Sequence, residues 1–206
     1  MLIEVLVNGG ADACSISLAN TIYYIVKNPD THASLREELD AALAPSEKVA
    51  PWSKAKSLDY LRACINESMR LSPPVATDLT RKTPPEGHTI DGEAVPGNTT
   101  VSISAYTAHR DAEIFPDPES FKPERWLIKG DDRLKRMNSV WIPFTAGPRA
   151  CIGRNVTILF QLVYLATIFY QYDFALTSRD WEQDWEDTFN LWPNPLPMKI
   201  WRRGLK

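Results

Sequence analysis

One segment limits the possible folds more than any other, because a loop that ends in a cysteine runs straight into a long apolar stretch. The loop, from Phe144 to Gly153, contains two glycines and a proline, which disfavour regular structure. The apolar stretch, from Val156 to Tyr170, is interrupted by Gln161 and is shorter than the roughly 20 residues that span a bilayer. We therefore expect a helix over residues 151–172 that is buried in a protein core and begins at the cysteine.

A cysteine at a helix start has distinctive chemistry. The first turn presents unpaired N–H groups and a partial positive charge, which favour the thiolate form of Cys151. We expect Gly147 to let the backbone approach the sulfur and Gly153 to keep the helix side clear, because neither carries a Cβ. Arg149 adds a cation suited to a carboxylate. The alternative is a buried structural cysteine, which is the usual state of a lone Cys.

Composition fits an ordinary folded domain. The chain has 206 residues, of which 44% are hydrophobic and 24% charged. A net charge of −3 without a Lys/Arg block gives no support for nucleic-acid binding. The three widely spaced cysteines argue against a disulfide framework or a zinc site and favour a reducing, intracellular environment. The N-terminus does not resemble a signal peptide, and we expect no membrane anchor in this chain.

Periodicity predicts a mainly helical chain with small β-elements in one partial domain. Apolar residues recur at helical spacing in three further segments: 1–27, 31–43 and 58–71. Asp91-Gly92 predicts a hairpin between residues 89–90 and 94–95, and alternation predicts a strand over 99–105. Residues 109–150 show little periodicity and are expected to be irregular. Short strands are expected at 174–176 and 198–201.

The cysteine loop resembles that of a known family. Its residues match every fixed position of Phe-x-x-Gly-x-Arg-x-Cys-x-Gly, the haem-ligand loop of the cytochrome P-450 family. The resemblance implies that Cys151 is the axial ligand of the haem iron. It also implies that the other fixed residues lie at the cofactor: Phe144, Gly147, Arg149 and Gly153.

Two further segments resemble the same family in the same order. Glu67 and Arg70 match its Glu-x-x-Arg motif, three residues apart on one helix face. Residues 123–126 resemble its Pro-Glu-Arg-Phe motif, with Trp126 in place of Phe. By resemblance, Arg125 joins Glu67 and Arg70 in a structural network that fixes the loop before the cysteine. A solvated surface ion pair is the alternative for such a Glu–Arg pair.

Residues 8–14 resemble the family's distal helix segment, Ala-Gly-x-Asp-Thr-Thr, with three departures. Gly9 replaces Ala, Ala13 replaces the first Thr, and Cys14 replaces the second. The resemblance implies that Asp12 delivers protons to dioxygen, whereas Ala13 lacks the hydroxyl of the relay. A solvated or capping acid is the alternative for Asp12. Arg81 stands where the family places an arginine that binds a haem propionate, as does Arg149; an ordinary surface arginine is the alternative for Arg81.

The resemblance implies the C-terminal portion of the cytochrome P-450 fold, mainly α with small β-sheets and incomplete at the N-terminus, over residues 1–206. It implies a monooxygenase with haem b that inserts one atom of dioxygen into a small organic substrate, with electrons from NADPH through a separate reductase. The closing segment resembles a fungal-type tail. The full-length parent would be anchored in the endoplasmic-reticulum membrane by a segment absent from this chain.

Two alternatives to a monooxygenase stay open. The chain could be a truncated, non-catalytic remnant or the product of an incomplete gene model, and on its own we expect it to be inactive. It could also belong to a haem-thiolate isomerase or a peroxide-using enzyme, which needs no proton relay to dioxygen. Ala13 favours this second alternative.

Overall fold

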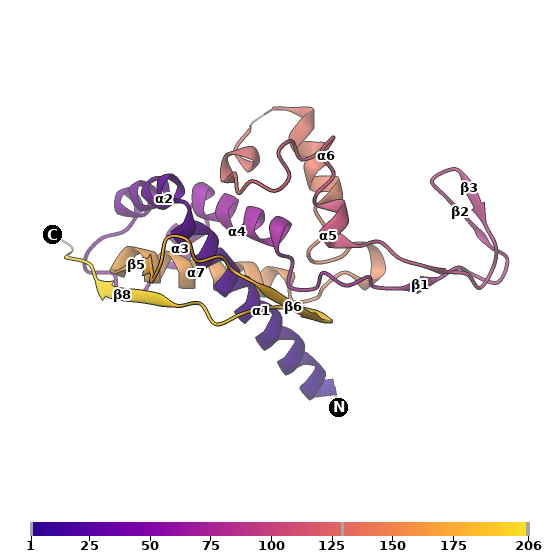
Figure 1. The fold of residues 1–206 in the computed structure, drawn as a ribbon, viewed down its shortest axis with the longest axis horizontal. Helices are drawn as coiled ribbons and strands as arrows, with labels where there is room; N and C mark the ends of the chain where they lie inside the picture. The colour runs from indigo at the N-terminus through magenta and orange to yellow at the C-terminus, as the bar shows by residue number, and fades with distance from the viewer. Residues whose placement is uncertain (1, 129, 205–206) are drawn as a thin grey trace.

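A computed structural model describes residues 2–128 and 130–204, apart from the side chains of residues 2–6 and 8. Met1 and the side chain of Asn8, which belong to the expected first helix and to the distal segment, lie outside the described residues. Within these limits the fold is helix-rich (Figure 1), with the following helices: α1 (Leu2–Lys27), α2 (Pro29–Ala42), α3 (Trp52–Ala55), α4 (Asp59–Leu71), α5 (Ala105–Ala108), α6 (Asp132–Val140) and α7 (Arg154–Gln171).

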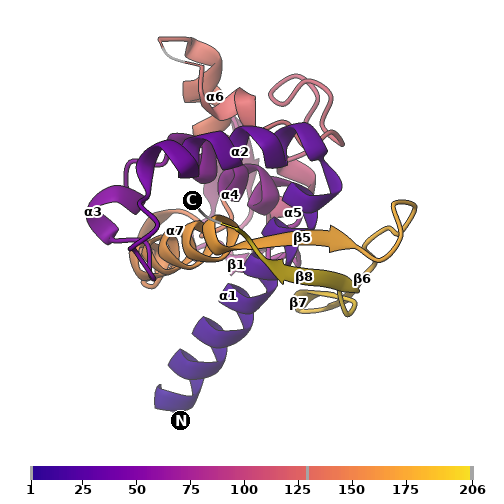
Figure 2. The same cartoon turned by 90° about the vertical axis from the view of Figure 1, so that its left-hand side faces the viewer.

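The core lies where α1, α2, α4 and α7 meet. Helix α1 packs against the other three, and α2 lies over α7, as Figure 2 shows. Buried residues recur every three or four positions on α7, as expected for a helix with one apolar face, whereas on α4 they occupy most positions from Leu61 onward. They include Leu61, Ile65, Leu162 and Leu165. The four helices predicted from periodicity are therefore confirmed, with boundaries that differ by no more than three residues.

Two details of the helices are seen only in the structure. Asn28 does not cap α2 through its side chain; its Nδ2 donates instead to the carbonyl oxygen of Tyr24 at the end of α1. Helix α7 is buried on one face only, since Val156 and Phe160 are exposed in the described part of the molecule. The continuous apolar stretch hides this asymmetry, because periodicity cannot be read from a segment that is apolar all round.

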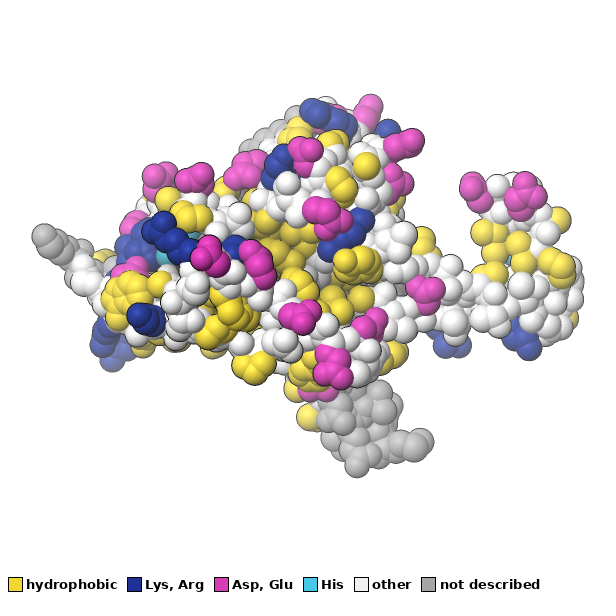
Figure 3. All heavy atoms as spheres, viewed as in Figure 1, with side chains coloured by type: hydrophobic (Ala, Val, Ile, Leu, Met, Phe, Trp, Pro, Cys, Tyr) yellow, Lys and Arg dark blue, Asp and Glu magenta, His cyan; other side chains and the backbone are white. Residues whose placement is uncertain are grey.

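The strands form small antiparallel pairs in the described part of the chain. The pairs are β1 (Arg81–Lys82) with β4 (Thr100–Val101), β2 (His88–Ile90) with β3 (Glu93–Val95), β5 (Tyr172–Leu176) with β8 (Met198–Arg202), and β6 (Trp185–Thr188) with β7 (Asn190–Pro193). The predicted hairpin is confirmed: Asp91 and Gly92 have φ values of 51° and 83°, as a two-residue turn requires. The hairpin stands apart from the body of the molecule (Figure 3).

Two sequence predictions in the middle of the chain are wrong. The strand expected over 99–105 ends at Val101, because its partner β1 is only two residues long, and Ser104 then caps α5 by accepting from the N–H of Thr107. The stretch 109–150 is not irregular throughout: it contains α6 and the 3₁₀ turns Pro123–Trp126 and Gly147–Arg149. Asp131 caps α6, and Met137 is its buried apolar contact.

None of the helices described here is long and apolar enough to cross a membrane.

Candidate functional site

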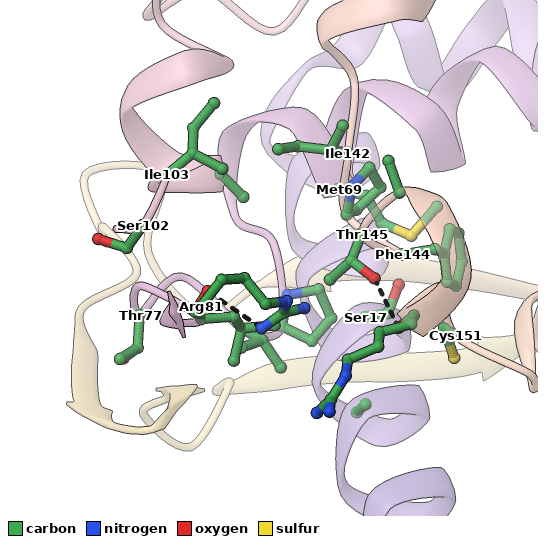
Figure 4. Close-up of a pocket in the computed structure, with 18 of the residues that line it drawn as sticks. Ser17, Met69, Thr77, Arg81, Ser102, Ile103, Ile142, Phe144, Thr145 and Cys151 are labelled. Atoms are coloured by element: carbon green, nitrogen blue, oxygen red, sulfur yellow. Dashed lines mark hydrogen bonds between the residues drawn. The ribbon is translucent and has the colours of Figure 1, made fainter. Parts of the chain in front are cut away.

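The cysteine loop is closed on itself by backbone hydrogen bonds. The N–H of Cys151 donates to the carbonyl oxygen of Phe144 at 2.9 Å, and the N–H of Ala150 donates to that of Gly147 at 3.0 Å. The hydroxyl of Thr145 donates to the carbonyl oxygen of Arg149 at 3.2 Å, one of the dashed bonds in Figure 4. These bonds hold the thiol of Cys151 on the outside of the loop, where it is exposed.

The two glycines of the loop differ from their expected roles. Gly147 has φ +75°, a conformation that favours glycine, yet an added Cβ would meet no atom within 4 Å. Its role is therefore conformational rather than steric. At Gly153 a Cβ would lie 3.7 Å from Sγ of Cys151, an ordinary contact. Helix α7 begins at Arg154, so the cysteine precedes the helix by three residues and does not lie in its first turn.

A cavity of about 670 Å³ lies beside the loop. Figure 4 shows Phe144 and Cys151 on one side of it, and Ser102 and Ile103 on the other. The structure brings four of the predicted cofactor residues to this cavity: Arg81, Phe144, Arg149 and Cys151. Gly147 and Gly153 shape the loop but are not among the described residues that line the cavity.

The cavity carries two cations. Arg81 Nη1 donates to the carbonyl oxygens of Leu79 and Thr80 at 3.2 and 2.9 Å. Neither Arg81 nor Arg149 forms an ion pair with a carboxylate of the described chain. Both guanidinium groups can therefore bind carboxylates of a ligand. A thiol, two such cations and apolar walls together fit a haem, which has an iron, two propionates and an apolar ring.

Helix α1 supplies another wall of the cavity. Ala13 and Ser17 line it, whereas Asp12 is half-buried beside Ala13 and is not among the described lining residues. The carbonyl oxygen of Asp12 accepts a hydrogen bond from the hydroxyl of Ser15 at 2.9 Å. The relay hydroxyl is expected at position 13, and the side chain that faces the cavity there is the methyl group of Ala13.

The predicted network around Glu67 is assembled in the core. Glu67 and Arg70 are fully buried, and Arg125 is 8% exposed. Arg70 donates to both carboxylate oxygens of Glu67 at 2.9 Å, through Nε and Nη2. Arg125 Nε donates to Oε1, also at 2.9 Å. The pair is therefore not a solvated surface bridge, and its burial demands this full pairing.

Two further donors to Glu67 were missed by sequence reasoning. Trp126 Nε1 donates to Oε2 at 2.9 Å, and the backbone N–H of Lys122 donates to Oε1 at 3.0 Å. Five donors from two segments therefore converge on one carboxylate. Trp126 occupies the Phe position of the Pro-Glu-Arg-Phe motif. Its indole N–H, which can donate a hydrogen bond, was the feature of the sequence from which this donor could have been predicted.

His109 links this network to the cysteine loop. Its ring is fully buried; Nε2 accepts from the N–H of Ile142 at 2.8 Å, and Nδ1 lies 3.2 Å from the carbonyl oxygen of Arg70. Burial, reinforced by the nearby charges of Arg70 and Arg110, lowers the pKa of His109 to about 4. The neutral imidazole therefore holds the chain two residues before Phe144.

Comparisons with known proteins show the family of the chain. Residues 1–200 match the Cytochrome P450 family model. The chain is 36% identical over 177 residues to cytochrome P450 monooxygenase apf7 of Gibberella fujikuroi, covering 83% of this chain and 33% of that protein. It is 37% identical over 199 residues to cytochrome P450 monooxygenase hepC of Aspergillus oryzae, covering 92% of this chain and 39% of that protein.

A solved structure agrees as well. The fold superposes on the crystal structure of a cytochrome P450 (CYP102L1) with a TM-score of 0.83 and 28% identity, covering 98% of this chain and 44% of that one. The chain thus spans less than half the length of each of these three proteins. Both of these monooxygenases come from fungi, and the helix-rich fold with small sheets corresponds to part of the solved P450 structure. The chain belongs to the cytochrome P450 family.

Proposed function

We propose that residues 1–206 form the C-terminal part of a single haem-binding domain in a monooxygenase. The whole protein would insert one atom of dioxygen into a small organic substrate, with electrons from NADPH through a separate reductase. The observation that carries the proposal is the cavity that Cys151 shares with Arg81 and Arg149. A thiol and two cations without carboxylate partners in the described chain suit a haem b and its two propionates.

Each site residue has a distinct role in this proposal. Cys151 Sγ ligates the iron, while Arg81 and Arg149 bind the propionates. Phe144 lines the same cavity as the thiol, and Gly147 makes the turn that presents the thiol, which its φ of +75° supports. A bound haem would supply the oxygen chemistry, which a thiolate ligand favours by pushing electron density toward the iron.

The remaining residues act through the scaffold or through protons. Glu67, Arg70 and Arg125 hold the segment before the cysteine loop and take no part in chemistry. Asp12 would deliver protons to the cavity from its edge, since its neighbour Ala13 lines the cavity directly.

A second candidate is a haem-thiolate isomerase or a peroxide-using enzyme. The methyl group of Ala13 in the cavity wall favours it, because the relay hydroxyl expected at that position is missing. Activity with a hydroperoxide alone, and none with NADPH and reductase, would select this candidate over the monooxygenase.

A reduced, carbon-monoxide-bound spectrum tests the thiolate ligand. The haem-loaded, full-length protein that carries this chain should give the red-shifted Soret band of a thiolate-ligated ferrous carbonyl, and Cys151→Ser should abolish it. Cys64→Ala is the matched control and should keep the band, because burial raises the pKa of the Cys64 thiol well above its ordinary value and keeps it protonated. Survival of the band in Cys151→Ser would disprove the assignment.

A further inference from the structure

A seam of polar side chains joins α1 to α7 behind the cavity. Cys14 Sγ lies 3.4 Å from Oγ1 of Thr157. One helical turn further along both helices, Ser17 Oγ donates a hydrogen bond of 2.9 Å to Oε1 of Gln161. Thr157 and Ser17 also line the cavity that contains Cys151. The seam therefore starts at the cavity wall and leads inward between the two helices.

The inner end of the seam carries two buried amides with unpaired groups. Asn20 follows Ser17 by three positions and lies on the same helix face. Asn20 and Gln161 are fully buried, and Nδ2 of the first and Nε2 of the second have no hydrogen-bond partner in the described chain.

Exchanging the amide oxygen and nitrogen would not remove this deficit. Oδ1 of Asn20 accepts from Nε1 of Trp185 at 3.1 Å, and an indole N–H can only donate, so the Asn20 amide has one orientation. Ser17 can donate or accept, so flipping Gln161 keeps its bond to Ser17 but leaves the amide oxygen unpaired instead. Both residues therefore lack a partner in either case.

Buried polar groups in this situation are usually paired with ordered water, because native proteins leave few of them unpaired. We propose that Ser17, Asn20 and Gln161 hold ordered water between α1 and α7. We further propose that this water, acting through the Ser17 hydroxyl, supplies protons to a ligand in the cavity; this second part rests on the monooxygenase function proposed above.

The chemistry of the cavity wall gives Ser17 this role. Ala13 and Ser17 are the described side chains of α1 that line the cavity, and only Ser17 carries a hydroxyl. Ser17 O–H passes its proton to an acceptor in the cavity and takes one from the seam water, which regains a proton from solvent. No charge remains on Ser17 after the transfer. The route bypasses Ala13, where the methyl group cannot relay a proton.

The water itself is tested first, independently of any activity. A high-resolution crystal structure of the haem-loaded, full-length protein should show water within hydrogen-bond distance of Asn20 Nδ2 and of the Gln161 amide. Density that shows an empty seam would overturn the proposal.

A stability measurement gives a second, independent test of whether the seam holds water. The double variant Ser17→Ala/Gln161→Met removes both hydrogen-bonding partners at similar volume. In a hydrated seam the water and Asn20 lose partners, so Tm should fall. In a dry seam the change removes an unpaired buried amide, so Tm should stay constant or rise, and this would overturn the hydration.

Proton supply is tested in protein that shows the thiolate carbonyl band, which separates its failure from failure of the haem assignment. Ser17→Ala should lower the rate of NADPH-supported turnover by about tenfold or more and raise its solvent deuterium isotope effect. Thr21→Val is the matched control: it removes a buried hydroxyl from the same helix, one that donates only to the carbonyl oxygen of Ser17 at 2.7 Å. The same rate and isotope effect in both variants would overturn the role of Ser17.

Discussion

The imidazole of His109 makes the stability of this fold depend on pH in a defined window. The ring is fully buried, and Nε2 already accepts the N–H of Ile142, so a proton added there would face another donor. The guanidinium groups of Arg70 and Arg110 also disfavour the charged ring. Burial is the main cause, and together these effects lower the pKa of His109 from 6.5 to about 4.

The sign and size of the effect follow from this pKa. Because the folded protein has the lower pKa, protonation favours the unfolded chain. The contribution of His109 to stability is complete above pH 6.5 and is lost as the pH falls from 6.5 toward 4. At about 1.4 kcal/mol for each pH unit, the loss over this window is about 3 kcal/mol. Below about pH 4 the residue should cause no further loss.

Urea unfolding of wild type and His109→Gln at a series of pH values between 4 and 7.5 measures this effect. Carboxylates titrate in the same range, so the informative quantity is the difference in unfolding free energy between the two proteins. That difference should shrink by about 3 kcal/mol from pH 7 to pH 4. His88→Gln, at an exposed histidine on β2, should leave the pH profile of wild type unchanged. A wild type–His109→Gln difference that is constant with pH would refute the reasoning.

Three other outcomes are expected. Glu67→Ala should lower the free energy of unfolding by about 3–5 kcal/mol, because two buried arginines lose their counter-charge; an unchanged urea midpoint would contradict this. Ala13→Thr should raise the amount of product formed per NADPH consumed and lower the release of hydrogen peroxide. If wild type and variant both convert NADPH to product with equal and high efficiency, this prediction is wrong. Leu165→Ala should cost about 2–5 kcal/mol by urea unfolding, since this side chain is fully buried. Leu159→Ala, on the same helix but 42% exposed, should cost clearly less, and equal costs would show that the burial pattern is wrong.

The long helices were predictable because each carries its own signal. Leu61 and Ile65 repeat at helical spacing, and Asp91-Gly92 specifies a tight hairpin turn without reference to distant residues. The cysteine loop could likewise be recognised from the sequence, because its glycines and Cys151 lie within ten residues of one another. Local pattern therefore predicted the main helices and the approximate position of the thiol.

Features that depend on distant partners could not be read in this way. Four of the nine residues of helix α6 are charged, and its single buried side chain, Met137, makes a weak periodic signal. The contact between His109 and Ile142 joins segments 33 residues apart, and no local pattern identifies it. The Ser17–Gln161 bond spans 144 residues. Such pairs depend on how whole helices pack against one another. Periodicity predicts only which face of a helix is buried, not which residues of another helix it contacts.

The convergence of five donors on Glu67 also bears on how the chain folds. The donors lie on α4 itself and 55 to 59 residues further along the chain, so a long loop must close before the carboxylate is fully paired. A half-formed network is worse than none, because it buries a charge beside groups that still need partners. The segment 116–126 should therefore dock in a single, late and cooperative step. Substitutions there should speed unfolding much more than they slow folding.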